Sequence, residues 1–499
     1  MGIIQKDAIR TTIISYLGLI LGYVNKGVLF VIFLSTEQIG LLNLLVSVGL
    51  LFAQLSNLGM SYSVWRFFPF FRNKEKKNHG FFQLSMLVTL CGIILFSILT
   101  IVFENQICEL FIEKSSSFVH YYYWLLPIGI SYALFLTLDN FLRSLYKNIV
   151  SVIATELLMR LAVTAAVVFY AFGWIDFFQL LVLHSLSFLV PTLILLAQLF
   201  RNKELNWRVS QIRIPQRFRR IFISYSLYSY VNFIGILIVI SLDTIMVASM
   251  LGLSETGVFS TVIYIVSGLQ IPYKSLIRIS SPFVAKYWKE RDMVKMKDLY
   301  TRVSSIGLVI GAFVFLCFWA NRVEIFHFLP EEYDSGIPVF LILMVGRLVD
   351  MYCGINGVIV VSSKKYKYDI VFMLVLLAAV FLLNWYWIPI YGIYGAAMAT
   401  TIAYVVYNAL RLIFVFSAYR IHPLRITQLK VFTVFLATFG VTYFLPVLFG
   451  NDFISIVVKL FLVTIAFLGT ILLFRLDEDV TGYLNKAIGW VIPKKEKEA

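Results

Sequence analysis

The sequence predicts an all-α polytopic membrane protein with fourteen transmembrane helices, and two observations support this. First, 60% of the 499 residues are hydrophobic and only 14% are charged, whereas a soluble globular chain has about 45–50% apolar and about 25% charged residues. Second, the apolar residues gather into windows of about 20 residues, the length that crosses a bilayer. This composition excludes an ordinary soluble protein, and the aromatic content of 16% excludes a disordered one.

Fourteen hydrophobic windows follow one another with mostly short linkers between them. They cover 11–34, 40–63, 81–103, 118–138, 150–172, 177–200, 224–250, 257–277, 301–321, 337–362, 368–388, 393–418, 431–449 and 453–474. The first window lacks a small-residue cleavage site, so we expect a transmembrane helix there and not a signal peptide. The four cysteines lie far apart with no Cys-x-x-Cys pair, which argues against a metal site or a disulfide framework.

The basic residues alternate between linkers. Thirty-three of the 42 lysines and arginines fall in every second linker and at the chain ends, whereas only Lys114 and Arg322 fall in the intervening linkers. Because cytoplasmic loops retain lysine and arginine, both termini are predicted to be cytoplasmic. This topology accounts for the net charge of +15, so no nucleic-acid partner is expected.

Two segments in different halves of the chain resemble each other. EQIGLLNLLVSVGLLF occupies 37–52 and SETGVFSTVIYIVSGL occupies 254–269, an offset of 217 residues. The predicted divisions are an N-lobe of six helices (1–200), a basic cytoplasmic linker (201–223), a C-lobe of six helices (224–418), two accessory helices (419–474) and an amphipathic basic tail (475–499). Because six is even, the lobes share one orientation and form a parallel pseudo-twofold repeat.

Two stretches carry a family resemblance. STEQIGLLNLLVSVGLLFAQLSNLGM (35–60) and DTIMVASMLGLSETGVFSTVIYIVSGLQIPYKSLIRISSPFVAKYWKERDMVKMKDLYTRVSSIG (243–307) resemble the polysaccharide transporter (oligosaccharide or O-antigen flippase) family of the multidrug/oligosaccharidyl-lipid/polysaccharide (MOP) superfamily. The similarity covers essentially the whole chain, including the layout of fourteen spans.

The resemblance implies a transporter and not an enzyme, located in the bacterial inner membrane. Such a flippase moves a polyprenyl-pyrophosphate-linked oligosaccharide, such as an O-antigen, capsule or exopolysaccharide repeat unit, from the inner to the outer leaflet. The implied partners are this glycolipid, membrane lipids and other polysaccharide assembly proteins. The resemblance leaves the glycan, the carrier lipid, the energy source and the oligomeric state open.

Ionisable residues inside the windows mark the candidate site, because a charge at mid-bilayer costs about 2.5–3.5 kcal/mol on insertion scales. The candidates for substrate binding in a central cavity are Asn25, Lys26, Arg160, Arg347 and Arg411. The candidates for charge pairing or ion coupling are Glu156, Asp243 and Asp350. Guanidinium suits pyrophosphate because it stays charged and binds phosphate bidentately. No resident cofactor is expected, and coupling to H⁺ or Na⁺ stays open.

Three of these residues have a structural alternative. The offset of 217 carries Lys26 onto Asp243, so the two either line the cavity or form an ion pair between the lobes. Arg411 lies about seven residues from the inner end of its window and either reaches the cavity or snorkels to the surface.

Four other candidates form two short-range pairs. Glu156 and Arg160 lie one helical turn apart, and so do Arg347 and Asp350. Each pair either neutralises itself, which lowers the cost of insertion, or offers its arginine to a pyrophosphate.

Three other functions compete with this flippase. A multidrug exporter of the toxin-extrusion type is expected to have a mainly acidic cavity, whereas the candidates here have a small basic excess. A lipid II flippase is separated poorly by sequence alone. A membrane polysaccharide polymerase or glycosyltransferase is the most distant alternative, since the longest linkers on the predicted outer side have only about 15 residues each. The chain has no Gly-x-x-x-x-Gly-Lys-[Ser/Thr] loop, so direct ATP drive is not expected.

Overall fold

The computed structural model describes residues 3–71, 80–145, 148–202, 216–444, 451–474, 476, 481 and 482. Every element in those ranges is a helix, which confirms the all-α class. The helices pack as two compact units, the first comprising Met1–Thr261 with Ile388–Gly392 and the second Val262–Trp387 with Ile393–Ala499. Most of the predicted linker (201–223) and tail (475–499) lies outside the described residues.

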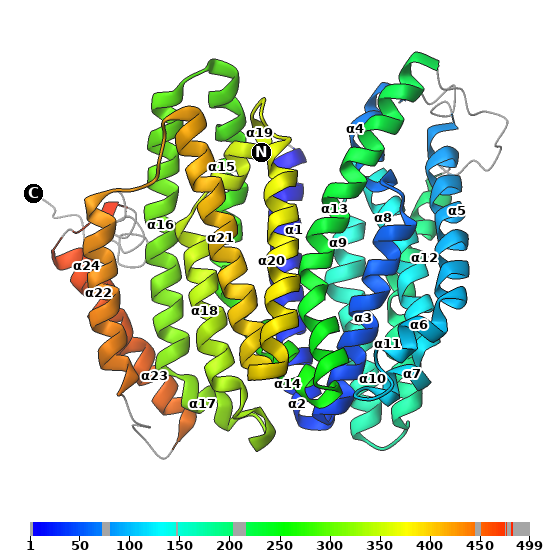
Figure 1. The fold of residues 1–499 in the computed structure, drawn as a ribbon, viewed down its shortest axis with the longest axis horizontal. Coiled ribbons are helices and arrows are strands. Elements are labelled where there is room, and N and C mark those ends of the chain that lie inside the picture. The colour runs from blue at the N-terminus through cyan, green and yellow to red at the C-terminus, as the bar shows by residue number, and fades with distance from the viewer. Residues whose placement is uncertain are drawn as a thin grey trace, which may run out of the picture. The chain divides into compact units, whose positions relative to one another are not determined.

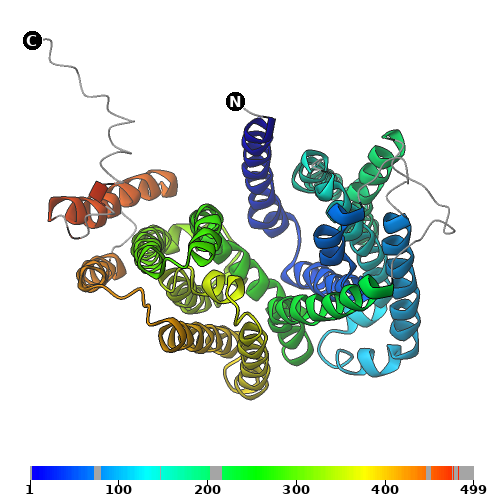
Figure 2. The ribbon, with the colours of Figure 1, turned by 90° about the horizontal axis from the view of Figure 1, so that it is seen from above.

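The first unit contains the helices from α1 to most of α14 (Figure 1). Their bounds are α1 (Ile3–Tyr23), η1 (Val24–Leu29), α2 (Phe30–Phe33), α3 (Thr36–Ser56), α4 (Met60–Phe71), α5 (Phe81–Val102), α6 (Glu104–Glu109), α7 (Ser116–His120), η3 (Tyr122–Trp124), α8 (Leu125–Ser144), α9 (Ile149–Ile153), η4 (Ala154–Leu158), α10 (Met159–Ala171), α11 (Phe177–Ser187), α12 (Leu189–Arg201), α13 (Gln216–Met250) and α14 (Leu253–Ser267). Helices α3 and α13 lie side by side in both views (Figure 2).

The second unit contains the helices that follow, apart from the last turn of α20. Their bounds are η6 (Gly268–Gln270), α15 (Ile271–Glu290), α16 (Met293–Ala320), α17 (Arg322–His327), η7 (Glu331–Tyr333), α18 (Gly336–Tyr352), α19 (Asn356–Ser362), α20 (Tyr368–Tyr391), α21 (Ile393–Tyr419), α22 (Ile426–Tyr443), α23 (Asp452–Val463), η8 (Thr464–Gly469) and α24 (Thr470–Leu473). Helix α16 packs against α15, α18, α22 and α23 and is thus the central helix of this unit.

Eleven helical runs among the described residues are long and apolar enough to cross a membrane, and a twelfth is added if α18 and α19 count as one bent span. These runs coincide with the first six and the last six predicted windows. The seventh window falls on α13, and the eighth falls on α14, whose 15 residues are followed by η6 and α15. The chain is thus a multi-pass membrane protein, whereas the count of fourteen and the cytoplasmic termini stay predictions.

The two packing units differ from the predicted lobes. Helices α13 and α14 follow the basic linker in sequence, so the repeat assigns them to the second half. In the structure, α13 packs along α3 and α4, which places it in the first unit. Units defined by packing and repeats defined by sequence need not coincide, so the predicted division at 201–223 stays a prediction.

Aromatic packing fixes one end of the first unit. Phe68 of α4 is fully buried between Phe81 of α5 and Phe141 of α8, with ring centroids 6.2 Å and 4.8 Å away. Edge-to-face packing at such distances stabilises aromatic pairs beyond their burial. These rings therefore hold three helices together near the predicted inner surface.

Two π-helical turns interrupt helices of the first unit. Turn η1 follows α1, and turn η4 precedes α10. A π turn widens the helix by one residue and is uncommon except at functional sites. Both turns contain charged residues that the sequence marks as candidates, Lys26 in η1 and Glu156 in η4.

The second unit has a broken span. Helices α18 and α19 meet at 52° across residues 353–355. Gly354 there has φ +64°, a left-handed conformation that glycine adopts without strain. The Tyr273 hydroxyl on α15 donates a hydrogen bond to the Gly354 carbonyl at 2.5 Å and thereby satisfies one backbone group freed by the break. Breaks of this kind commonly line binding cavities in transporters.

A tight corner joins α15 to α16. Arg291 adopts φ +56°, and Asp292 then caps α16 by accepting a hydrogen bond from the Lys295 backbone N–H. The Lys295 ammonium, 2.8 Å from the Asp292 carboxylate, holds the pKa of that carboxyl below its ordinary value. This polar corner carries the basic cluster that the sequence assigns to the cytoplasmic side.

Candidate functional site

The candidate residues fall into two groups, one in each packing unit. The first unit contains Asn25, Lys26, Glu156, Arg160 and Asp243, and the second contains Arg347, Asp350 and Arg411. Each group is described separately.

In the first unit, the two π-helical turns lie against each other's helices. Turn η4 packs on α1, and α10 packs on η1. The close approach depends on Gly18, because a Cβ placed there lies 2.5 Å from the Glu156 Cβ. Gly18 therefore lets the Glu156 side chain settle directly on the first span.

The Arg160 guanidinium has two partners where η4 packs on α1. Its Nη2 lies 2.6 Å from the Glu156 Oε2, and its Nη1 donates a hydrogen bond to the Gly18 carbonyl at 2.5 Å. The Glu156–Arg160 pair anticipated from the sequence therefore forms. Both side chains remain partly exposed, at 27% for Arg160 and 30% for Glu156.

Asn25 fixes the backbone beneath that arginine. Its Nδ2 donates to the Arg160 carbonyl at 2.9 Å, and its Oδ1 accepts from the Thr164 hydroxyl at 2.7 Å. Asn25 is 3% exposed. Asn25 therefore positions the backbone of Arg160, and its contact with substrate stays a prediction.

Lys26 begins a chain of hydrogen bonds that connects η1 with α3 and α14. Its Nζ donates to the Asn43 Oδ1 at 3.0 Å, and the Asn43 Nδ2 donates to the Ser260 Oγ at 2.9 Å. Asn43 and Ser260 are separated by 217 residues, the offset of the predicted repeat. Asp243 is buried on α13 in the same unit, and its predicted pairing with Lys26 stays a prediction.

Two glycines near the Asn43–Ser260 hydrogen bond also occupy equivalent positions in the two repeats. Gly40 on α3 and Gly257 on α14 also differ by the repeat offset. A Cβ at Gly40 lies 1.9 Å from the Leu253 carbonyl oxygen, and one at Gly257 lies 1.9 Å from the Thr36 carbonyl oxygen. Residues at equivalent repeat positions therefore contact each other, which supports the alignment on which the 217-residue offset rests.

In the second unit, a cavity of about 500 Å³ opens at the broken span. Its lining residues come from α15, the break, α19 and α21, namely Tyr273, Lys274, Ile277, Asp350, Gly354, Asn356, Gly357, Val358, Val361, Ser362 and Arg411. Two cations and one carboxylate thus face one cavity. Lys274, which is outside the candidate set, belongs to this lining.

Asp350 and Arg347 have different partners. The Asp350 carboxylate accepts hydrogen bonds from the Gln270 Nε2 and from the Asn408 Nδ2, each at 3.1 Å. The Arg347 guanidinium lies over the Tyr404 ring, 5.1 Å from its centroid. The described contacts of Arg347 and Asp350 are therefore with neighbouring helices, and whether the pair neutralises itself or offers its arginine to a pyrophosphate stays a prediction.

Arg411 pairs with a carboxylate from α20. Its Nε and Nη2 both bind the Asp369 Oδ1, at 2.9 Å and 2.5 Å. The Tyr407 ring lies 4.0 Å from the guanidinium carbon. Arg411 therefore lines the cavity while paired with a carboxylate.

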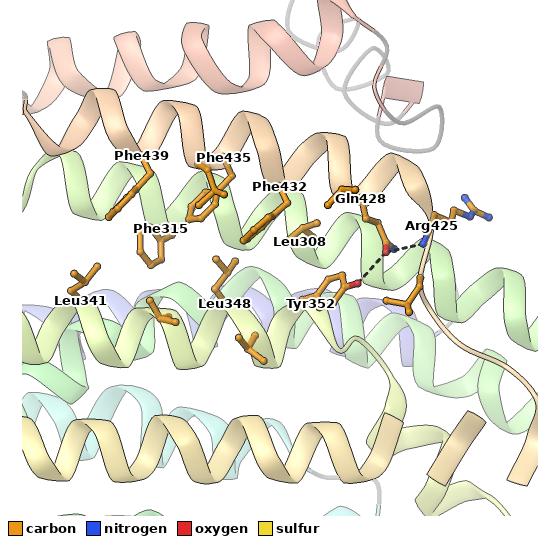
Figure 3. A pocket seen from close by; sticks show the side chains of 15 residues that line it. Leu308, Phe315, Leu341, Leu348, Tyr352, Arg425, Gln428, Phe432, Phe435 and Phe439 are labelled. Atoms are coloured by element: carbon orange, nitrogen blue, oxygen red, sulfur yellow. Dashed lines mark hydrogen bonds between the residues drawn. The ribbon is translucent and has the colours of Figure 1, made fainter. Parts of the chain in front are cut away.

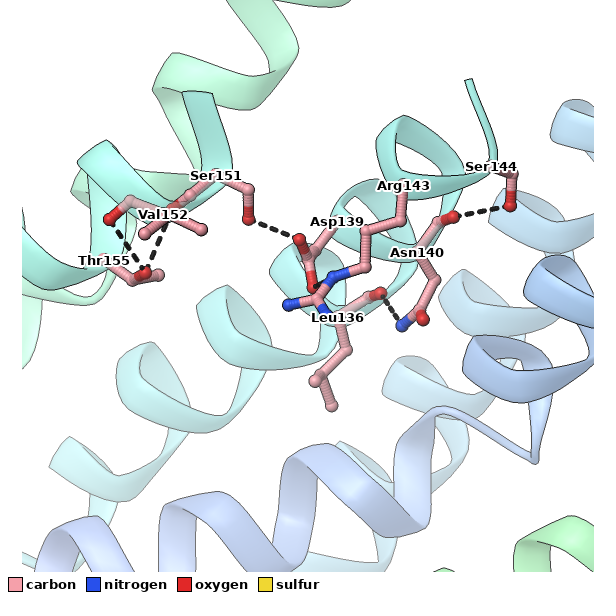
Figure 4. Close-up of polar contacts among 8 residues, drawn as sticks. All are labelled: Leu136, Asp139, Asn140, Arg143, Ser144, Ser151, Val152 and Thr155. Carbon is pink, nitrogen blue, oxygen red and sulfur yellow. Dashed lines mark hydrogen bonds and ion pairs between the residues drawn. The ribbon is translucent and has the colours of Figure 1, made fainter. Parts of the chain in front are cut away.

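Further polar pairs lie outside the candidate set. Asp139 on α8 is buried and binds both the Arg143 Nε at 2.7 Å and the Ser151 hydroxyl (Figure 4). Lys459 on α23 pairs with Glu324 on α17 at 2.5 Å, and both side chains are fully buried. Neither residue is among the candidates, and this pairing leaves no local signal in the sequence because the two residues lie in distant segments.

An apolar groove of about 840 Å³ runs between α18 and α22 along α16 (Figure 3). Phenylalanines and leucines line most of it. Tyr352, Gln428 and Arg425 close one end, where the Gln428 Oε1 accepts from the Tyr352 hydroxyl at 3.4 Å and from the Arg425 backbone N–H at 3.1 Å. This groove could not be predicted from the sequence, because it arises where α22 leans on α16 and leaves α18 uncovered.

The many apolar helices, one of them a broken span, define a multi-pass membrane protein. Residues 4–288 match the family model described as "Polysaccharide biosynthesis protein". Because that match covers more than half of the chain, the protein belongs to this family. The resemblance inferred from residues 35–60 and 243–307 is thereby confirmed.

Two solved structures and one curated protein are similar to the chain. An inward-facing multidrug resistance transporter of the MATE family in the MOP superfamily superposes with a TM-score of 0.65 at 15% identity, covering 81% of this chain and 94% of that one. The lipid II flippase MurJ, in an inward closed conformation, gives a TM-score of 0.69 at 14% identity, covering 94% of this chain and 98% of that one. At such identities the likeness concerns the fold alone.

The curated protein is the capsular polysaccharide biosynthesis protein CapF of Staphylococcus aureus. It is 24% identical over 160 residues, which make up 32% of this chain and 40% of CapF. The aligned part therefore spans less than half of that relative.

Proposed function

We propose that the protein is a flippase that carries a polyprenyl-pyrophosphate-linked oligosaccharide from the inner to the outer leaflet of the bacterial inner membrane. The observation on which this depends is the family match over residues 4–288, which links the chain to polysaccharide synthesis. The fold, similar to that of a MATE transporter and of MurJ, links it to transport.

The cations within and beside the apolar helices agree with such a substrate. Sugars and a pyrophosphate cannot cross hydrocarbon alone, because removing them from water without replacement partners costs too much. Arg160 and Lys26 in the first unit, with Arg347, Lys274 and Arg411 in the second, offer charged hydrogen-bond donors to phosphate oxygens.

Alternating access supplies the mechanism. Rigid groups of helices rock around a central site, so that the site opens to one surface at a time. The π turns η1 and η4 and the break between α18 and α19 are points near the candidate residues at which the helices depart from regular geometry. Asp243, Glu156 and Asp350 are the carboxylates proposed to take part in charge pairing or in coupling to an ion.

A flipping assay tests the proposal. The protein is reconstituted in liposomes with a fluorescent polyprenyl-pyrophosphate glycan, and leaflet exposure is read by an impermeant quencher. We expect Arg160→Gln to slow flipping at least tenfold, since one charged hydrogen bond to phosphate is worth about 1.5–3 kcal/mol. Arg143→Gln is the matched control, because Arg143 makes the same i, i+4 pair away from the site, and it should flip at the wild-type rate.

The rival functions are arms of the same assay. Flipping of lipid II in preference to other polyprenyl-pyrophosphate glycans would assign the chain to lipid II transport. Export of a cationic dye without movement of the glycolipid would assign it to drug export. Equal rates for wild type and empty liposomes with every substrate would remove the proposal.

A further inference from the structure

The structure points to Glu156 as an internal stand-in for the substrate's phosphate: it neutralises Arg160 when the site is empty and is displaced when a pyrophosphate binds. We infer this from the two unequal attachments of the Arg160 guanidinium. The inference rests on the proposed function and deepens it, because it says how one site both accepts and releases an anionic headgroup.

One set of hydrogen bonds to Arg160 does not involve Glu156. Its Nη1 binds the Gly18 carbonyl of the first span, while Asn25 and Thr164 both bind the Arg160 carbonyl, at 2.9 Å and 2.8 Å. These are neutral groups of α1, η1 and α10. The arginine would therefore keep its position if the Glu156 carboxylate moved away.

The other attachment is exchangeable. Glu156 lies in a π turn, and its side chain is 30% exposed, so it is not enclosed on all sides. Its carboxylate occupies the Nη2 side of the guanidinium, which is the side left open by the Gly18 contact.

Chemistry explains why exchange is useful. An unpaired arginine inside a membrane is costly, so an empty site benefits from a built-in carboxylate. A pyrophosphate offers more charge and more acceptor oxygens than one carboxylate, and guanidinium binds phosphate bidentately. An anion must displace the Glu156 carboxylate to bind Arg160, so weakly binding anions are excluded. The same competition lowers the affinity for the pyrophosphate headgroup, which can then dissociate at the outer leaflet.

A binding experiment separates exchange from a purely structural ion pair. The full chain in lipid nanodiscs is titrated with polyprenyl pyrophosphate and, in parallel, with uncharged polyprenol. We expect Glu156→Gln to bind the pyrophosphate about tenfold more tightly than wild type, with no change for polyprenol. Flipping should become slower in the same variant, because release is impeded.

Three further variants make the test specific. Arg160→Gln should weaken pyrophosphate binding about tenfold, and the double variant Glu156→Gln/Arg160→Gln should match Arg160→Gln alone. Asp139→Asn, which alters an i, i+4 pair of the same geometry on α8, should bind like wild type. If Glu156→Gln does not fold, Glu156→Asp keeps the charge one methylene further back and should show a smaller tightening.

The outcomes are distinguishable. Unchanged or weaker pyrophosphate binding in a folded Glu156→Gln or Glu156→Asp variant overturns the exchange inference while leaving the flippase intact. Tightening that persists without Arg160 also overturns it. A wild-type protein that neither binds the pyrophosphate nor flips the glycolipid removes the proposed function itself.

Discussion

At the scale of single residues, most of the charged candidates contact a partner on a neighbouring helix, as Lys26 contacts Asn43 and Arg411 contacts Asp369. The cost of burying a charge made Lys26, Arg160, Arg347 and Arg411 visible, because such residues are rare inside apolar windows. Neutral partners on other helices, such as Asn43 for Lys26 and Asn408 for Asp350, are ordinary polar residues that a window analysis passes over. Pairing depends on which helix faces turn towards each other, and this is decided by packing and not by composition.

Gly18 provides a test of close packing at the site. Gly18→Ala places a methyl group 2.5 Å from the Glu156 Cβ, so the first span and η4 must move apart. Overpacking of this kind costs about 1–3 kcal/mol, and we expect a lower Tm in detergent, measured by tryptophan fluorescence.

Gly27→Ala is the control for that measurement. Gly27 lies on the same span as Gly18, and a methyl group there meets no atom within 4 Å. Alanine also favours a helix over glycine by about 1 kcal/mol. An equal loss of stability in both variants would contradict the packing explanation.

At the scale of elements, regular helices were predictable and their interruptions were not. Apolar length alone placed the windows that coincide with α3, α5 and α20. The π turns leave no pattern in a single sequence, because they depend on how neighbouring helices satisfy an extra backbone residue. The break after α18 had a visible signal, the two glycines of Cys-Gly-Ile-Asn-Gly at 353–357, since glycine-interrupted spans often mark transporter sites.

The accessory helix α23 offers a second test. Lys459→Met leaves the Glu324 carboxylate fully buried without its ammonium partner. Removing one partner of a buried pair costs about 3–5 kcal/mol, whereas replacing both by apolar residues is often neutral. We therefore expect Lys459→Met to lower the Tm strongly and Lys459→Met/Glu324→Leu to recover most of it. If the double variant is as unstable as the single one, the ion pair is not the cause.

At the scale of the whole molecule, the multi-pass architecture and the family were predictable, because bilayer thickness fixes the length of a span and topology fixes where basic residues lie. The packing units were not. The sequence assigns α13 to the second half, whereas its contacts with α3 and α4 place it in the first unit. A long helix between two repeats can pack with either, and only the shapes of its faces decide.

Topology is tested by labelling single cysteines in a background without the four native ones. Lys114→Cys and Lys365→Cys both replace exposed side chains. The basic residues predict that an impermeant thiol reagent labels position 114 from outside intact cells. Position 365 should react only after the membrane is opened. The reverse pattern would invert the orientation, and labelling of both in intact cells would contradict the span count between them.

The contact between Gly40 and Gly257 also bears on ancestry. Two identical chains related by a twofold axis touch through the same residue on each copy where the axis passes, and these glycines meet in that manner although one chain carries both. A gene half as long, encoding a six-helix protein that paired with itself in a common orientation, would leave this mark after duplication and fusion. An isolated first half would then be expected to associate as a homodimer through α3.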